Sequence, residues 1–346
     1  MEQHDIEIRI DEIMREAQGY RRGRIYTVFA ELEIAEALEA GPRTIDDLAS
    51  AIQADPTALT RFLDAAAQLG IVDNTADGHV NLTKLGWKLY SPSSPESRAN
   101  TLKLEAAFFE RWSRLATAVC TGNRPPENRQ QEDDPRWVPM FTRALFERSR
   151  ETARGVAQAI NNLIADPGDS PVRVLDLGGG HGGYSIALAR SNPAVEATVF
   201  DLPPVIETTS EIVETSEVRD RMQAVAGDFH HDDIGSGWDL ILLFGVLHGE
   251  TEEGANALLS AIANALATNG KLLIRRQGRA DSEPATAERE IFDLHMLLST
   301  EGGKVSRSAD TQAQLAGHGF RLEREIDIPA PASGAIEIYV MDDDSS

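Results

Sequence analysis

Two aspartates and a run of glycines are the residues of this sequence best suited to chemistry. Asp176 stands near the end of an apolar stretch, and five glycines follow within the six residues Gly178 to Gly183. Asp201 ends the next apolar stretch, 23 residues after Gly178. Glycines let a backbone approach a ligand closely, and an acid at the second strand end can accept both hydroxyls of a ribose.

A third acid, Asp228, follows the third apolar stretch and is itself followed by Phe229. The pair offers an adenine a polar edge and a flat face. Three acids at three successive strand ends suit a nucleoside that carries positive charge better than a dinucleotide. The glycine run also matches G-x-G-x-x-G, which alone is a weak signal of a dinucleotide site.

The elements around these residues alternate between strands and helices from residue 171 onward. Apolar, β-branched runs predict strands at 172–177, 196–200, 222–226, 238–244 and 271–275, with helices at 184–191, 204–214, 253–267 and 286–298. This alternation indicates an α/β fold with a doubly wound parallel sheet. A last helix at 311–317 precedes strands at 320–326 and 335–341, which we expect to form a hairpin at one edge.

The first hundred residues have a different pattern. Two helices are expected within 6–40, then a short helix at 45–52, a helix at 57–69 and a small hairpin around residues 71–82. This order is typical of a winged helix, so DNA binding has to be considered. Four basic residues against six acidic ones between Arg43 and Lys88, and a mostly apolar second helix, argue against it. Such a helix more often packs against a partner chain or another domain.

Composition excludes several classes of protein. The chain has 346 residues, enough for two domains, and a net charge of −23 that repels nucleic acid and anionic membranes. No apolar run approaches the roughly 18 residues of a membrane span. A single cysteine, Cys120, allows neither an internal disulfide nor a cysteine-based metal cluster. A cytoplasmic protein without a metal is expected.

Between the two regions we expect a long helix at 98–119, a polar loop at 121–135 and a helix at about 138–164. The domain division that follows is 1–100 for the winged-helix domain, 101–165 for a helical connector and 166–346 for the α/β domain.

Four motifs together resemble a known family. Val174-Leu-Asp-Leu-Gly-Gly-Gly-His-Gly-Gly, Val199-Phe-Asp-Leu-Pro-Pro-Val, Ala226-Gly-Asp-Phe and Val246-Leu-His248 are similar to the successive motifs of class I S-adenosylmethionine methyltransferases. The closest resemblance is to the small-molecule O-methyltransferases of plants and bacteria, such as acetylserotonin and caffeate methyltransferases. It extends into the N-terminal region, where Leu32-Glu-Ile-Ala-Glu-Ala-Leu resembles part of the family's dimerisation domain.

The resemblance implies a Rossmann-like methyltransferase sheet, an N-terminal dimerisation domain and a homodimer. It implies that Gly178 and Gly180 border the methionine part of S-adenosylmethionine, Asp201 its ribose, and Asp228 with Phe229 its adenine. The same motifs add Asp176, Leu202 and Phe244 to the expected cofactor-binding residues. His248 is implied as the general base that deprotonates a hydroxyl of the acceptor.

Near His248 the sequence departs from the family pattern. Gly249-Glu250 follows the histidine where the family usually has Asp-Trp, and Phe244 stands where a lysine is common. The two glutamates that orient the histidine in the family align with Arg276 and with the neighbourhood of Val305. Glu250 is therefore a second candidate base, and Arg276 either binds an anionic substrate or forms a surface salt bridge.

The acceptor atom stays open at this point. A hydroxyl is the default, because the histidine is kept. The alternative is sulfur methylation of a small anionic thioether, such as 4-methylthio-2-hydroxybutyrate in dimethylsulfoniopropionate synthesis, which needs no base. A transcription factor with a vestigial cofactor fold and a nicotinamide dehydrogenase are the alternatives from other classes. By position in the family, the acceptor pocket is lined by Phe108, Trp112, Trp137, Phe141, Leu145, His295 and Met296, and Arg276 is added as the side chain that would bind an anionic substrate.

Overall fold

The computed structural model describes residues 3–74, 78–126, 132–161, 163–164, 170–247, 250–276, 287–300, 308–329 and 334–342. The chain divides into two compact units, residues 1–110 and 111–346. The predicted boundary near residue 165 lies outside the described residues, and the three-part division stays a prediction.

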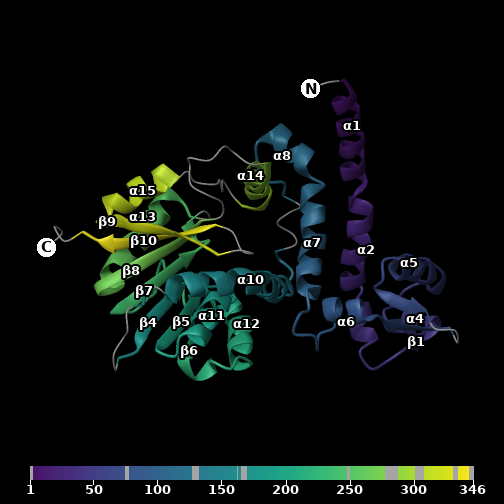
Figure 1. The fold of residues 1–346 in the computed structure, drawn as a ribbon, viewed down its shortest axis with the longest axis horizontal. Coiled ribbons are helices and arrows are strands. Elements are labelled where there is room, and N and C mark those ends of the chain that lie inside the picture. The colour runs from purple at the N-terminus through teal and green to yellow at the C-terminus, as the bar shows by residue number, and fades with distance from the viewer. Residues whose placement is uncertain are drawn as a thin grey trace. The chain divides into compact units, whose positions relative to one another are not determined.

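The N-terminal unit is mostly helical (Figure 1). Its helices are α1 (Gln3–Gln18), α2 (Tyr20–Glu31), α3 (Ile34–Ala37), α4 (Ile45–Ala51), α5 (Pro56–Gln68), α6 (Lys84–Tyr90) and α7 (Ala99–Trp112), the last of which crosses into the second unit. A small antiparallel sheet has the order β1-β3-β2, formed by Arg43–Thr44, His79–Leu82 and Val72–Asn74. The expected order of helix, turn, helix and hairpin is therefore present.

Local signals place α4 and α5 where the sequence predicts them, and a similar signal starts α6, which was not predicted. The Asp55 side chain accepts the N–H of Ala58 at 2.8 Å and Pro56 opens α5, which together form a strong helix start. Thr44 and Thr83 cap α4 and α6 in the same way. The apolar faces meet in one core that includes Phe29, Leu48, Leu63, Ile71 and Tyr90.

The second unit is built on a seven-stranded sheet with the order β6-β5-β4-β7-β8-β10-β9. The strands are β4 (Val172–Leu177), β5 (Val195–Asp201), β6 (Met222–Ala226), β7 (Trp238–Phe244), β8 (Leu266–Arg276), β9 (Phe320–Asp327) and β10 (Ala335–Met341). Strands β4 to β8 are parallel, whereas β10 is antiparallel to both β8 and β9. The predicted parallel sheet and its edge hairpin are confirmed.

Helices cover both faces of this sheet (Figure 1). One core joins the strands to α10 (Trp137–Asn161), α11 (Gly183–Ser191) and α12 (Pro203–Glu214). The opposite core joins them to α13 (Glu252–Ala265) and α15 (Ser308–Gly317). The remaining helices are α8 (Leu115–Thr121), α14 (Ala287–Ser299) and a 3₁₀ turn at Arg219–Arg221. No described helix is both long and apolar enough to span a bilayer.

The single helix predicted at 98–119 is wrong, because α7 ends at Trp112 and α8 begins at Leu115. The break follows Arg111, whose buried guanidinium pairs with Glu132 at 2.9 Å and lies over the Trp137 ring at 4.6 Å. These partners are distant in sequence, and no glycine or proline marks the break. Helix α7 therefore ends where tertiary contacts form, although the local sequence carries no signal for a helix end.

Candidate functional site

The glycine run forms the turn between β4 and α11, at the carboxyl end of the central strand. Gly178, Gly180 and Gly182 all have positive φ, at 64°, 53° and 65°. A Cβ on Gly178 would lie 2.6 Å from the Val246 side chain, so glycine is required there on two grounds. A Cβ on Gly180 would have no atom within 4 Å, which leaves this part of the turn open to a ligand.

Asp201, at the end of β5, is tied to the glycine turn. Its Oδ2 accepts the N–H of Gly180 at 2.8 Å, and its Oδ1 accepts the N–H of Leu202 at 2.7 Å. Burial raises the pKa of this carboxyl, and the two backbone hydrogen bonds oppose the rise. Each oxygen keeps acceptor capacity for a hydroxyl-bearing ligand. Leu202 is exposed at the start of α12.

Asp176 lies beneath the turn and is only 1% exposed. Its Oδ2 accepts the Ser185 hydroxyl at 2.7 Å, and a Cβ on Gly179 would lie 2.6 Å from its carboxyl carbon. Burial raises the pKa of Asp176 to about 7, the Ser185 hydrogen bond opposes this, and the charge of Asp201 adds to it. The structure therefore shows Asp176 supporting the turn, and its contact with a ligand stays a prediction.

The third strand end supplies Asp228 and Phe229. Asp228 organises its own turn, because its Oδ1 accepts the N–H of His230 at 3.0 Å and its N–H donates to Asp232. The half-buried Phe229 packs into the core beside Val246, and both side chains adjoin the Cβ position of Gly178. These two apolar groups give the glycine turn a flat, apolar neighbour.

Phe244 ends β7 and meets the ring of Tyr184 edge-on, at 5.3 Å between centroids. The guanidinium of Arg275, on β8, lies 5.8 Å from the centroid of the same tyrosine. Neither Tyr184 nor Arg275 is among the predicted site residues. The alternation of β8 was a usable signal for Arg275, since it separates Arg275 from Ile274, which belongs to the opposite core.

His181 is the glycine turn's one large side chain, and it is buried. Its Nδ1 accepts the N–H of Gly183 at 2.9 Å, and its ring packs near Phe146 and Tyr184. Burial lowers the pKa of this imidazole to about 4, so it is neutral at physiological pH. We assign it a structural part in shaping the turn.

Several of the predicted residues near His248 lie outside the described residues. His248 and Gly249 lie outside the described residues, as does the segment around Val305, and Arg276 is described only as the backbone end of β8. Glu250 is described, and its Oε2 lies 3.1 Å from Nε2 of His230. The second candidate base thus already has a partner.

The predicted acceptor residues form two aromatic groups in the second unit. Trp112 Nε1 donates to Nδ1 of His295 at 3.3 Å, and the two rings stack at 6.4 Å. Trp137 and Phe141 stack at 5.6 Å. Met296 is buried and Leu145 is half-buried on α10. Phe108 belongs to the N-terminal unit, on α7.

The electrostatics around His295 keep its ring uncharged. Burial, then the charges of Arg111 and Arg148, lower the pKa of His295 to about 4. With Nδ1 accepting from Trp112, the proton belongs on Nε2, which faces the Ser299 hydroxyl at 3.4 Å. A neutral, stacked histidine with a fixed tautomer suits the wall of a pocket for a flat molecule.

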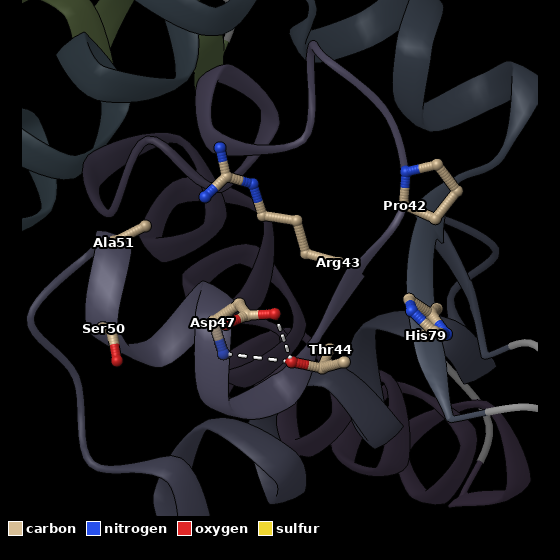
Figure 2. Close-up of a pocket in the computed structure, with 7 residues that line it drawn as sticks. All are labelled: Pro42, Arg43, Thr44, Asp47, Ser50, Ala51 and His79. Carbon is tan, nitrogen blue, oxygen red and sulfur yellow. Dashed lines mark hydrogen bonds between the residues drawn. The ribbon is translucent and has the colours of Figure 1, made fainter.

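A hollow of about 490 Å³ lies elsewhere, in the N-terminal unit. Figure 2 shows its lining, formed by Pro42, Arg43, Thr44, Asp47, Ser50, Ala51 and His79. The Thr44 hydroxyl donates to the Asp47 carboxylate at 2.8 Å and accepts the Asp47 N–H, which is a helix cap. None of the predicted site residues lines it, so we give it no catalytic part.

Each of the two units matches a known protein family. Residues 129–321 match the O-methyltransferase domain family, and residues 14–92 match the O-methyltransferase dimerisation domain. The mitomycin biosynthesis 6-O-methyltransferase of Streptomyces lavendulae is 29% identical over 332 residues, which cover 93% of this chain and 92% of that protein. O-methyltransferase SfmM3 of the same organism is 28% identical, with coverages of 89% and 93%.

Solved structures agree with this assignment. The mitomycin 7-O-methyltransferase MmcR superposes with a TM-score of 0.73 at 27% identity, covering 98% of each chain. LaPhzM superposes with a TM-score of 0.78, covering 96% of this chain and 99% of that one. At 24% identity this second likeness concerns the fold alone. The chain therefore belongs to the O-methyltransferase family and is a methyltransferase of small molecules that uses S-adenosylmethionine.

Proposed function

We propose that this protein transfers a methyl group from S-adenosylmethionine to a hydroxyl of a small, flat, aromatic molecule. The observation that carries the proposal is the carboxyl edge of the sheet, where Asp201 and Gly180 are joined at an open glycine turn. The paired aromatic rings of Trp112 with His295 and Trp137 with Phe141 support a flat acceptor. The names of the relatives support oxygen, and not sulfur, as the acceptor atom.

The residues present fit the cofactor. Gly180 leaves open space at the turn, and Asp201 offers acceptor capacity for the ribose hydroxyls. Phe229 and Val246 supply apolar surface next to Gly178, which suits the adenine. When bound, S-adenosylmethionine supplies a methyl group on a positively charged sulfur. The residues of this protein orient the acceptor and take its proton. Positioning lowers the activation barrier by on the order of several kcal/mol.

His248 is our candidate for the group that takes the proton from the acceptor hydroxyl. Its neighbour Glu250 is a weaker candidate, because its carboxylate is engaged by His230. A positioned base contributes roughly two to four powers of ten to the rate. We therefore expect His248→Ala to lower kcat by at least a hundredfold.

The test measures turnover and cofactor binding for His248→Ala and Glu250→Gln side by side, with a panel of hydroxylated aromatic acceptors. The His248→Ala protein should bind S-adenosylhomocysteine as the wild type does, which shows that the fold is intact. Turnover that survives His248→Ala would refute the general-base assignment. A wild-type chain that methylates none of the panel would refute the aromatic acceptor.

We also propose a homodimer formed through the N-terminal unit. Helix α1 exposes five large apolar side chains, Ile6, Ile8, Ile10, Ile13 and Met14. An exposed apolar surface of this kind marks a site where another protein packs. The match of residues 14–92 to a dimerisation domain supports a second copy of this chain as the partner. The cytoplasm is the proposed compartment, where the exposed free thiol of Cys120 would stay reduced.

A further inference from the structure

Arg275 is a cation at the carboxyl edge of the sheet that the mechanism above does not use. It is the second-last residue of β8 and pairs with Phe244 of β7 on one side and Ile336 of β10 on the other. The glycine turn leaves β4 at the same edge, because β4, β7 and β8 are parallel neighbours. Arg275 is therefore placed among the strand ends that form the site.

The side chain of Arg275 lies on the face of the sheet that α10 and α11 cover. Leu273, two residues earlier on β8, belongs to the core on that face, and Phe244 and Tyr184 pack against the same core. The Arg275 guanidinium lies 5.8 Å from the centroid of Tyr184, in the first turn of α11. A cation beside this ring is fixed next to the glycine turn.

Arg275 has no counter-ion in the described part of the chain. Its Nε is buried there without a hydrogen-bond partner. Asp176, the acid near the end of β4, is bonded to Ser185 instead. Other arginines of this unit, Arg111, Arg143 and Arg190, each pair with a glutamate. A half-buried arginine without an acid is notable in a chain of net charge −23.

From these contacts we infer that Arg275 binds a carboxylate of a ligand held at the glycine turn. A guanidinium fixed in one plane matches a carboxylate with two parallel hydrogen bonds, and leaving its Nε buried and unpaired is costly. The carboxylate belongs either to the methionine part of the cofactor or to the acceptor. The acceptor source rests on the proposed function, and the cofactor source rests only on the use of S-adenosylmethionine.

Two pairs of ligands distinguish these sources by calorimetry. The first pair is S-adenosylhomocysteine and its decarboxylated form, S-adenosyl-3-thiopropylamine. The second pair is 3,4-dihydroxybenzoate and 3,4-dihydroxybenzamide, titrated into protein saturated with S-adenosylhomocysteine. In wild type we expect the ligand with the carboxylate in one pair to bind at least tenfold tighter than its counterpart without it, as for a charged hydrogen bond.

The variants are Arg275→Met, which removes the charge, and Arg275→Lys, which keeps it. Arg275→Met should abolish the preference within the pair that shows it, and Arg275→Lys should restore part of it. Arg173→Met is the matched control, since Arg173 also lies over a ring, that of Trp238, but at the start of β4. It should keep the wild-type preference.

The results for Arg275→Met distinguish the two sources of the carboxylate. Loss of preference in the first pair assigns the cofactor carboxylate, and loss in the second assigns the acceptor carboxylate. If wild type shows no preference in either pair, or if Arg275→Met keeps it, the inference is overturned. A wild type that binds no S-adenosylhomocysteine refutes the cofactor assignment itself, which is a separate result. Circular dichroism of Arg275→Met, with its binding of the ligands that lack a carboxylate, shows whether the fold persists.

Discussion

The backbone N–H of Gly180 donates to the Asp201 carboxylate over 2.8 Å, and this one bond joins the ends of two adjacent strands. It stabilises the conformation of the glycine turn, in which Gly178, Gly180 and Gly182 have positive φ angles. Asp201 therefore shapes the turn and offers its remaining acceptor capacity to the cofactor.

Replacing Asp201 by asparagine removes the charge while keeping the shape. A hydrogen bond that involves a charged group is worth about 1.5–3 kcal/mol, so S-adenosylhomocysteine affinity should fall roughly tenfold to a hundredfold. Isothermal titration calorimetry measures the change. Asp220→Asn is the control, because the Asp220 side chain is 93% exposed and should leave the affinity unaltered. Equal affinities of wild type and Asp201→Asn would contradict this role.

Asp176 should make the protein less stable as pH rises. Burial raises its pKa to about 7 from an ordinary value near 3.8. Below pH 4 the folded and unfolded states both hold the proton. Between pH 4 and 7 the unfolded chain releases it while the folded chain keeps it, so the free energy of unfolding falls by up to about 1.4 kcal/mol per pH unit. Above pH 7 the loss is complete.

The comparison with Asp176→Asn isolates this effect, since asparagine mimics the protonated acid at every pH. His181 and His295, whose pKa values are lowered to about 4, act in the opposite direction between pH 4 and 6.5 and are present in both proteins. Urea unfolding at several pH values should show the variant gaining on wild type from pH 4 to 7. A constant difference would contradict the burial of a protonated Asp176.

The sequence predicts most of the sheet because its strands are encoded locally. The strands at 172–177, 222–226, 238–244 and 335–341 have the predicted bounds. Each is a short apolar run. The break between α7 and α8 could not be predicted, because Arg111 finds Glu132 and Trp137 only after the chain has folded.

Part of the candidate site can likewise be predicted from the sequence, and part of it cannot. Asp201 and the glycines are found by their spacing, since strand ends of a parallel sheet meet at one edge. The grouping of Tyr184, Phe244 and Arg275 depends on the register between β7 and β8, which pairs Phe244 with Arg275. One sequence does not specify that register, and the resemblance aligns the family's glutamate with Arg276, the residue after Arg275.

Glu250 and His230 should behave as a pair. Their side chains are 17% and 32% exposed, and the atoms lie 3.1 Å apart. A double-mutant cycle of Glu250→Gln and His230→Asn should give a coupling of about 0.5–1 kcal/mol in stability. Both single variants should keep kcat within about tenfold of wild type, below the effect of a lost base. A hundredfold loss with Glu250→Gln alone would make Glu250 the base instead.

The apolar face of α1 should control the oligomeric state. Ile6, Ile10 and Ile13 follow the spacing of one helix face, and each is exposed, Ile10 by 54%. Glutamate at positions 10 and 13 would place two charges where the second copy is expected to pack, at a cost of several kcal/mol. Light scattering coupled to size exclusion should show a dimer for wild type and a monomer for the Ile10→Glu, Ile13→Glu variant.

The control for this variant is Val119→Glu, which puts the same charge on an apolar side chain of α8 that is 64% exposed. Val119 is outside the N-terminal unit, so this protein should stay dimeric. A wild-type monomer at micromolar concentration would contradict the proposed dimer. A dimer that survives both glutamates would place the interface on another surface, since two unpaired carboxylates could not remain buried between copies of α1.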